Sequence, residues 1–353
     1  MTSRPKRVAL VTRLPIDAAG GIESAVRELA PRIAARRPDW DVVLVHAFAR
    51  AGRWNRIPFV GDLVAAIVLA AKLRRCDAAV INGAEYAWPR MLRKRDRDRT
   101  VVVWHGTRAG EIPALVPAMS LAVRVYWLLE IWLQRWALRA RGQVAVSETT
   151  RAEIVATYRP RRAIAVVPNG APDEVGVPRT RSGRGRRVVW IGTNAYKKGL
   201  DIALAACEAA RTDIPDLELV PIGIALSAPE RAARPWVHDR GRVSHSESME
   251  LLASGDVLLA TSRYEGCSVA IIEALTLGIP IVAGPSVGWM VGGGGIAVES
   301  FGAERYARVL RSVLTSPERL QALSREARCQ ARRFDWEAAA EAYAGKIDAC
   351  LAE

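Results

Sequence analysis

The chain has 353 residues, which at about 150 residues per domain suggests two domains with separate cores. Half of the residues are apolar and a quarter are charged, a composition that excludes a disordered protein. Subtracting 37 Asp and Glu from 51 Lys and Arg gives a net charge of +14. The surface should therefore attract anions such as nucleotides, phospholipid headgroups or nucleic acid, without choosing among them.

The five cysteines are scattered along the chain, with no CxxC pair, so they indicate neither a disulfide framework nor a zinc site. The first apolar run ends at Arg13 and is too short for a signal peptide. Residues 63–73 are too few to span a bilayer, and residues 115–138 are interrupted by charges. We expect a cytoplasmic protein without a transmembrane helix.

Short β-branched runs alternate with helical patterns from the N-terminus onward. A helix is predicted over residues 23–36, and buried strands are predicted at 8–11, 42–45, 78–81, 101–104 and 144–146. This order predicts a parallel sheet covered by helices, forming a first Rossmann-like domain over residues 1–172.

Residues 173–187 are rich in Gly, Pro and Arg and poor in apolar residues, which predicts an exposed linker. Strand patterns then resume at 188–191, 217–221, 257–260 and 279–282. They predict a second Rossmann-like domain over residues 188–333, and residues 334–353 are expected to form a C-terminal helix that crosses back to the first domain. The fold class is therefore α/β.

Ligands bind open parallel sheets at the carboxyl ends of the strands, so the loops that follow strands are informative. Gly20 and Gly21 follow the first predicted strand and open a helix, whose N-terminus can face a phosphate. The loop lacks a GxGxxG fingerprint, and simple turn geometry is an equal alternative. Lys197 and Lys198 follow strand 188–191 and can neutralise a diphosphate, although loop lysines are often only solvated.

Residues 265–280 carry the strongest signal. Residues 269–277 read as a nearly apolar short helix with Ser268 as N-cap, yet Glu273 lies in its middle. A buried carboxylate is costly unless something hydrogen-bonds it, and ribose hydroxyls would be suitable donors. Glu265, on the loop before the helix, could reach a sugar hydroxyl. The alternative is that Glu273 pairs with a buried arginine.

The spacing of Glu265 and Glu273 resembles the E-x7-E motif of retaining glycosyltransferases with the GT-B fold, most closely family 4. The similarity extends along nearly the whole chain. It includes a GGxE loop at 20–23, a strand-end His-Gly at His105, a VS pair at 146–147, a PNG at 168–170 and an aromatic signature at 334–336.

This resemblance implies two Rossmann-like domains facing each other across a cleft that holds a nucleotide sugar. Glu273 would bind the ribose, Lys197 and Lys198 the diphosphate, and Gly20 and Gly21 the phosphate side from the other domain. The transferred sugar would contact Glu265 and the amides of Gly266, Cys267 and Ser268. His105 would contact the sugar or the reacting centre, the alternative being a strand-end histidine satisfied by backbone groups.

The implied reaction transfers a sugar, with retention, from a nucleoside diphosphate sugar, for which we expect UDP, to a hydroxyl acceptor. The departing phosphate would help to deprotonate the acceptor, and no cofactor besides the co-substrate is expected. Synthesis of a bacterial glycan, glycolipid or lipopolysaccharide would fit. The alternatives are a GT-B sugar phosphorylase, a nucleotide-sugar epimerase, or a non-catalytic nucleotide-binding protein.

Two motifs differ from the family pattern. Gly192-Thr193 stands where many members have Gly-Arg, so Lys197 would replace a phosphate-binding arginine, and the glycine-rich segment 284–295 has no assignable role. A DxD metal motif is also considered. Asp96 and Asp98 have this spacing, but they lie in a charge run before a strand rather than after one, so no metal is predicted.

A helix over residues 122–141 would separate two kinds of side chain. Val125, Leu129, Trp132, Leu133 and Trp136 fall on one face, and Arg124, Arg135 and Arg139 on another. The helix could lie on an anionic membrane, but we favour packing of its apolar face in the core. The expected partners are the nucleotide sugar, a sugar, lipid-linked or glycan acceptor, and the inner face of the cytoplasmic membrane, but not nucleic acid.

Overall fold

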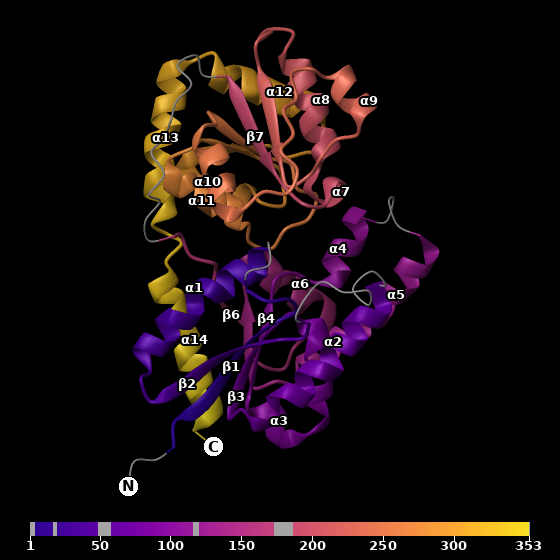
Figure 1. Ribbon diagram of the computed structural model, residues 1–353, viewed down its shortest axis with the longest axis vertical. Helices are drawn as coiled ribbons and strands as arrows, with labels where there is room; N and C mark the ends of the chain where they lie inside the picture. Colours follow the sequence, from indigo (N-terminus) through magenta and orange to yellow (C-terminus); the bar gives the residue numbers. More distant parts are fainter. Residues whose placement is uncertain (1–3, 17–19, 49–57, 116–119, 173–185, 353) are drawn as a thin grey trace. The chain divides into compact units, whose positions relative to one another are not determined.

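The computed structural model describes residues 4–16, 20–48, 58–115, 120–172 and 186–352 (Figure 1). The chain divides into two compact units. Unit 1 comprises Met1–Gly170 together with Asp335–Glu353, and unit 2 comprises Ala171–Phe334. Most of the predicted linker, residues 173–185, lies outside the described residues.

Unit 1 contains a six-stranded parallel sheet in the order β2-β1-β3-β4-β5-β6. The strands are β1 (Lys6–Thr12), β2 (Trp40–His46), β3 (Ala78–Asn82), β4 (Thr100–Trp104), β5 (Gly142–Ala145) and β6 (Ala165–Val166). Every residue of β3 and β4 is buried, as expected for central strands that helices cover on both faces.

The described helices of unit 1 are α1 (Gly21–Arg36), α2 (Pro58–Lys72), α3 (Lys94–Asp98), α4 (Arg108–Leu115), α5 (Leu121–Ala137), α6 (Glu148–Tyr158) and α14 (Trp336–Leu351). The C-terminal helix α14 packs against α1 (Figure 1). Arg36 bonds Glu337 and Glu341, and Arg37 bonds Asp348 at 2.7 Å. These ion pairs fix the last helix of the chain to unit 1.

Unit 2 contains a five-stranded parallel sheet in the order β11-β10-β9-β7-β8. The strands are β7 (Arg187–Ile191), β8 (Glu218–Ile222), β9 (Val257–Ala260), β10 (Ile281–Ala283) and β11 (Gly295–Ala297). The described helices are α7 (Ala195–Lys198), α8 (Leu200–Ala210), α9 (Ala228–Ala233), α10 (His245–Ala253), α11 (Val269–Leu277), α12 (Ala303–Leu314) and α13 (Pro317–Ala331). Each unit is therefore a Rossmann-like parallel sheet with its own core.

Helix α5 differs from the sequence expectation. Val125, Leu129 and Trp132 were expected in the core, but they are exposed by 60%, 40% and 54%. The buried side of the helix instead carries Tyr126 and Glu130, which have hydrogen-bond partners inside unit 1. The core-packing interpretation therefore holds for only part of the apolar face. Trp136 packs against the core of unit 1, whereas Val125, Leu129 and Trp132 do not, because a network of polar side chains occupies their side of the core.

Candidate functional site

The lysine loop follows β7 at the carboxyl edge of the unit 2 sheet. Asn194 caps the short helix α7 by accepting a hydrogen bond from the backbone amide of Lys197 at 2.9 Å. The helix ends at Gly199, whose φ of +70° is strained for other residues. A Cβ at this position would lie 2.2 Å from the carbonyl oxygen of Thr261, so only glycine lets the loop approach the end of β9.

This close approach brings two predicted site residues together. The Lys198 ammonium forms an ion pair with the Glu265 carboxylate, and both side chains are mostly buried. The Lys197 ammonium lies 5.6 Å from the centre of the Tyr264 ring, a cation–π arrangement. The two lysines and Glu265 therefore lie at one edge of unit 2, although they are more than sixty residues apart in the chain.

Glu273 lies in the middle of α11 and is 9% exposed. Burial raises the pKa of its carboxyl group to about 7. Its ion pair is with His245, whose Nε2 lies 3.7 Å from Glu273 Oε1, rather than with the buried arginine considered as an alternative. His245 begins α10 and is more than half exposed. His245 was not predicted as a site residue, because nothing in its local sequence pattern links it to α11.

The loop between Glu265 and α11 is also buried, including Gly266, Cys267 and Ser268. Ser268 occupies the N-cap position, but its side chain makes no capping hydrogen bond, so that detail of the sequence interpretation is wrong. Its backbone amide instead points to the Met290 sulfur, at 3.4 Å. The Ser268 hydroxyl is therefore not used to start the helix.

Arg263 was missed by the sequence analysis. Its guanidinium bonds both carboxylate oxygens of Asp201, at 2.8 and 2.6 Å, and the carbonyl oxygen of Tyr196 at 2.6 Å. It also stacks over the Tyr196 ring at 4.0 Å. Because Tyr196 precedes the two lysines, Arg263 holds the lysine loop against the end of β9. Asp201 lies 62 residues before Arg263 in the chain, so no local sequence pattern predicts that the two side chains pair.

The glycine-rich segment that had no assigned role packs against α13. A Cβ on Gly294 would lie 2.4 Å from the Cα of Ala327, so that helix can approach only a glycine. Gln330 of the same helix donates a hydrogen bond to the Met290 carbonyl at 2.8 Å. These contacts are structural, and they hold Met290 beside the backbone of Ser268.

In unit 1, His105 follows β4 at the carboxyl edge of the sheet. Its Nε2 lies 3.0 Å from the amide oxygen of Asn82, the last residue of the neighbouring strand β3. The amide nitrogen of Asn82 donates to the Val11 carbonyl at 3.1 Å, so its oxygen faces the ring. Because an amide oxygen only accepts, Nε2 carries the proton in this contact, and the Asn82 side chain helps to orient His105.

Gly20 and Gly21 start α1 at the same edge of unit 1. Gly20 is the N-cap and Gly21 the first helical residue, while residues 17–19 lie outside the described residues. A Cβ on Gly20 would lie 2.2 Å from the carboxylate of Glu23. The carboxylate of Glu23 therefore occupies the space beside the helix start, and burial there raises its pKa.

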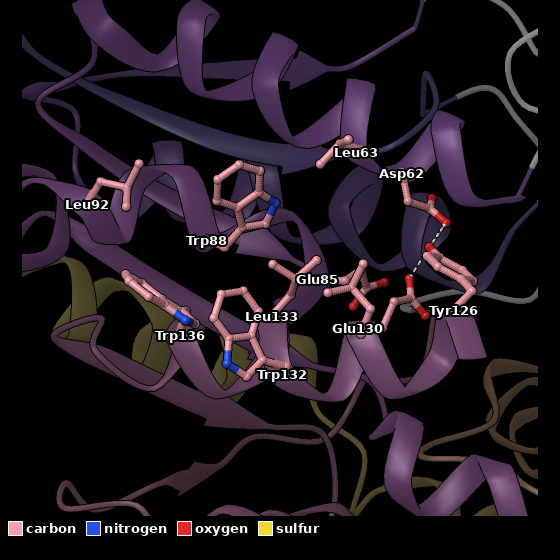
Figure 2. A pocket seen from close by; sticks show the side chains of 11 residues that line it. Asp62, Leu63, Glu85, Trp88, Leu92, Tyr126, Glu130, Trp132, Leu133 and Trp136 are labelled. Atoms are coloured by element: carbon pink, nitrogen blue, oxygen red, sulfur yellow. Dashed lines mark hydrogen bonds between the residues drawn. The ribbon is translucent and has the colours of Figure 1, made fainter. Parts of the chain in front are cut away.

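A second buried polar cluster in unit 1 was not predicted (Figure 2). The Tyr126 hydroxyl lies 2.7 Å from Asp62 and also contacts Glu130, and Arg108 pairs with Glu130 and, at 2.6 Å, with Glu111. Burial raises the pKa of Glu130 to about 7. Helical periodicity assigns such residues to solvent, so only the tertiary contacts reveal the cluster.

No group of three or more potential metal-ligating side chains occurs within the described ranges of the chain. Asp96 and Asp98 lie in α3, before β4, and Asp96 faces the Arg90 guanidinium at 3.8 Å. Within the same described ranges, no helix is long and apolar enough to cross a membrane.

Two Rossmann-like units, each built on a parallel sheet with candidate site residues at its carboxyl edge, define the GT-B class of fold. Sucrose-phosphate synthase from Thermosynechococcus elongatus has this fold, with a TM-score of 0.79 at 18% identity over 96% of this chain and 97% of that one. WaaG, a glycosyltransferase involved in lipopolysaccharide biosynthesis, gives a TM-score of 0.75 at 17% identity over 96% and 99%.

The sequence also matches two models of glycosyltransferase families. Residues 19–175 match Glycosyltransferase Family 4, and residues 185–316 match Glycosyl transferases group 1. Together the two matches cover most of both units, and the chain belongs to the group 1 glycosyltransferases.

Curated relatives match a shorter part of the chain. The D-inositol 3-phosphate glycosyltransferase of Segniliparus rotundus is 31% identical over 179 residues, 46% of this chain and 40% of that protein. The GDP-mannose:cellobiosyl-diphosphopolyprenol alpha-mannosyltransferase of Xanthomonas oryzae pv. oryzae is 29% identical over 171 residues, 44% of each. The matched stretch therefore spans less than half the length of these relatives.

Proposed function

We propose that this protein transfers a sugar from a nucleoside diphosphate sugar to a hydroxyl acceptor, with retention of the anomeric configuration. The main support is that candidate donor-binding residues lie together at the carboxyl edge of unit 2. There Lys198 pairs with Glu265, beside a helix that buries the carboxyl group of Glu273. Membership in the glycosyltransferase family supports the same assignment.

In this proposal, each group of unit 2 binds one part of the donor. Glu273 accepts hydrogen bonds from the ribose hydroxyls, which would compensate the burial of its carboxylate. Lys198 and Lys197 neutralise the diphosphate, and Glu265 with the amides of residues 266–268 binds the sugar. Because the Lys198 ammonium already has a carboxylate partner, a bound diphosphate would share the lysine with Glu265.

The proposed role of unit 1 is to bind the acceptor and to complete the reacting centre. His105 would touch the sugar, and the start of α1 at Gly20 and Gly21 would face the phosphates with its helix dipole. The bond between the anomeric carbon and the phosphate oxygen breaks, while the acceptor oxygen attacks from the same face. The acceptor proton passes to the departing phosphate, so the protein acts by positioning and by charge stabilisation.

The donor base is a separate part of the proposal. The sequence led us to expect UDP, whereas the name of the Xanthomonas oryzae pv. oryzae relative specifies GDP-mannose. The acceptor names are also varied, and they include a diphosphopolyprenol and an inositol phosphate. We keep UDP as the first candidate for this chain, and a panel of both bases tests it.

Thermal unfolding with a panel of UDP and GDP sugars tests the donor site. A ligand that binds only the folded protein raises Tm by mass action. We expect at least one nucleotide sugar to raise Tm of the wild type and to raise Tm of Glu273→Gln much less. Glu299→Gln, a change of an exposed glutamate in the same unit, is the matched control and should respond as the wild type does. If no nucleotide sugar raises Tm, the proposed donor site is wrong.

A further inference from the structure

An apolar cavity of about 330 Å³ lies in unit 1, between α2, α5 and the short helix Trp88–Leu92 (Figure 2). Its walls are formed mainly by large apolar side chains: Leu63, Trp88, Leu92, Leu129, Trp132 and Trp136. Leu63, Leu92, Leu129 and Trp132 are also exposed to solvent, so the cavity opens at the surface.

The acidic groups at one end of the cavity already have partners. Asp62 accepts from Tyr126 at 2.7 Å and faces Arg13 at 3.1 Å, and Glu130 pairs with Arg108. Glu85 accepts from Gln134 at 3.4 Å. Because these carboxylates are committed to unit 1, the cavity presents apolar surface to an occupant rather than open charge. Its complementary ligand is a hydrocarbon group.

Exposed apolar side chains continue outside the cavity. Twelve large hydrophobic residues are exposed within the described ranges. Seven of them lie on α2 or α5, and an eighth is Leu92. They are Leu63, Ile67, Leu92, Leu121, Val125, Leu128, Leu129 and Trp132. Scattered single exposed residues are ordinary, but such a concentration on one face marks an interaction surface.

One side of the cavity, at Trp136, borders on positive charge. The Arg139 guanidinium lies 3.9 Å from the centre of the Trp136 ring, and Arg135 is exposed on the same helix. Exposed Arg93, Lys94 and Arg95 directly follow Leu92. A hydrocarbon ligand with an anionic group would satisfy both the apolar walls and this basic border, which favours an anionic lipid over a second protein surface.

The polar end of the cavity connects to the edge of the sheet that carries His105. Glu85 belongs to the short helix Ala84–Tyr86, which follows β3 and Asn82. Gln134 contacts Glu85 with its amide nitrogen and accepts from the backbone amide of Arg108, three residues after His105, at 3.1 Å. Hydrogen bonds of Gln134 therefore join the wall of the cavity to the edge of the sheet that carries the proposed acceptor site.

We propose that this cavity binds the hydrocarbon chain of an anionic, lipid-linked acceptor. The inference rests on the proposed glycosyl transfer, of which it specifies the acceptor class. The apolar surface beyond the cavity contacts the lipid layer from which the acceptor comes, and Arg135 and Arg139 lie beside its anionic headgroups.

Calorimetric titration of the full chain with dodecyl phosphate, kept below its micelle concentration, tests the cavity directly. Each buried methylene contributes about 0.8 kcal/mol, so dodecyl phosphate should bind at least about 100-fold more tightly than butyl phosphate. Leu129→Asp places a charge on the cavity wall, and Leu92→Asp does so from a different element. Both residues are exposed enough to tolerate the change, and each variant should weaken binding at least about tenfold.

Val155→Asp is the matched control, because Val155 is an exposed apolar residue of unit 1 on α6. The affinity of Val155→Asp for dodecyl phosphate should be within about twofold of the wild-type value, because this substitution leaves the cavity walls intact. Equal affinity of dodecyl and butyl phosphate, or undiminished binding by both Leu129→Asp and Leu92→Asp, would overturn the inference.

The experiments also distinguish two other possible occupants of this apolar face. Binding to phosphatidylglycerol vesicles without binding of monomeric dodecyl phosphate would make the face a bilayer contact and overturn the acceptor cavity. Self-association that Leu129→Asp abolishes, again without dodecyl phosphate binding, would assign the face to a second copy of the chain. If dodecyl phosphate binds through Leu129 but no nucleotide sugar raises Tm, the hydrocarbon site is supported and the proposed transfer fails.

Discussion

Lys198 and Lys197 differ in their surroundings, and their contributions to donor binding should differ accordingly. Lys198→Ala should weaken donor affinity by about 1.5–3 kcal/mol, the range for hydrogen bonds to charged groups. Lys197→Ala should have a smaller effect, because its ammonium lies over the Tyr264 ring rather than against a carboxylate. Donor titration calorimetry measures both. Unchanged affinity in both variants would mean that the two lysines do not bind the donor.

Glu273 and Glu265 should separate kinetically. Glu273→Gln should mainly raise the donor KM, by about tenfold, because a bond to the ribose stabilises ground and transition states alike. Glu265→Gln should mainly lower kcat, because its contact with the sugar changes as charge develops on the ring. Steady-state kinetics with varied donor measures both parameters. A Glu273→Gln protein that unfolds yet keeps its donor affinity would assign Glu273 to the core instead.

The buried carboxyl group of Glu273 should also make stability depend on pH. Its pKa is about 7 in the folded protein and about 4.3 in an unfolded chain, so the folded state binds more protons between these values. The free energy of unfolding should therefore fall as pH rises from about 4.3 to about 7, by about 3 kcal/mol in all. Denaturant unfolding of the wild type and Glu273→Gln across this range isolates the contribution. Parallel curves for the two proteins would contradict it.

Site residues could be predicted where they stand out from the sequence immediately around them. Glu273 is anomalous within an apolar helix, and Lys197 and Lys198 follow a strand, so sequence reasoning could single them out. Arg263, His245 and Asn82 act through partners distant in sequence, and no spacing reveals such pairs.

Among the elements, the turn between α7 and α8 offers the sharpest stability test. Gly199→Ala should destabilise the protein by at least about 2 kcal/mol, because it combines a positive φ with a Cβ 2.2 Å from the Thr261 carbonyl oxygen. Gly345→Ala, in α14, is the control. With nothing within 4 Å of its Cβ, it should stabilise the helix by about 0.5–1 kcal/mol. Denaturant unfolding measures both, and equal effects would refute the role assigned to Gly199.

The strands of both sheets follow closely from their β-branched runs, because central parallel strands are buried on both faces. The exceptions are short. Strands β6 and β11 have two and three residues, too few for a periodic pattern. Helix α5 could be predicted from its helical periodicity, but its buried face could not. That face is set by Asp62 and Arg108, which supply hydrogen-bond partners for Tyr126 and Glu130.

At the scale of the whole molecule, the net charge of +14 and the lysines at the edge of unit 2 bear on metal dependence. We expect turnover to be unchanged in excess EDTA, because ammonium groups and helix N-termini supply the positive charge for the leaving diphosphate. A donor-turnover assay with and without chelator measures this. Loss of activity in EDTA that magnesium or manganese restores would show that a cation is required.

We propose above that the sugar is transferred with retention at the edge of unit 2. Proton NMR of the wild type with a stabilising nucleotide sugar and a bacterial membrane extract tests it most directly. We expect the anomeric signal of the donor to be replaced by a product signal of the same configuration, and more slowly with Glu273→Gln. A product of inverted configuration, or a nucleotide sugar that binds but is never consumed, would contradict it.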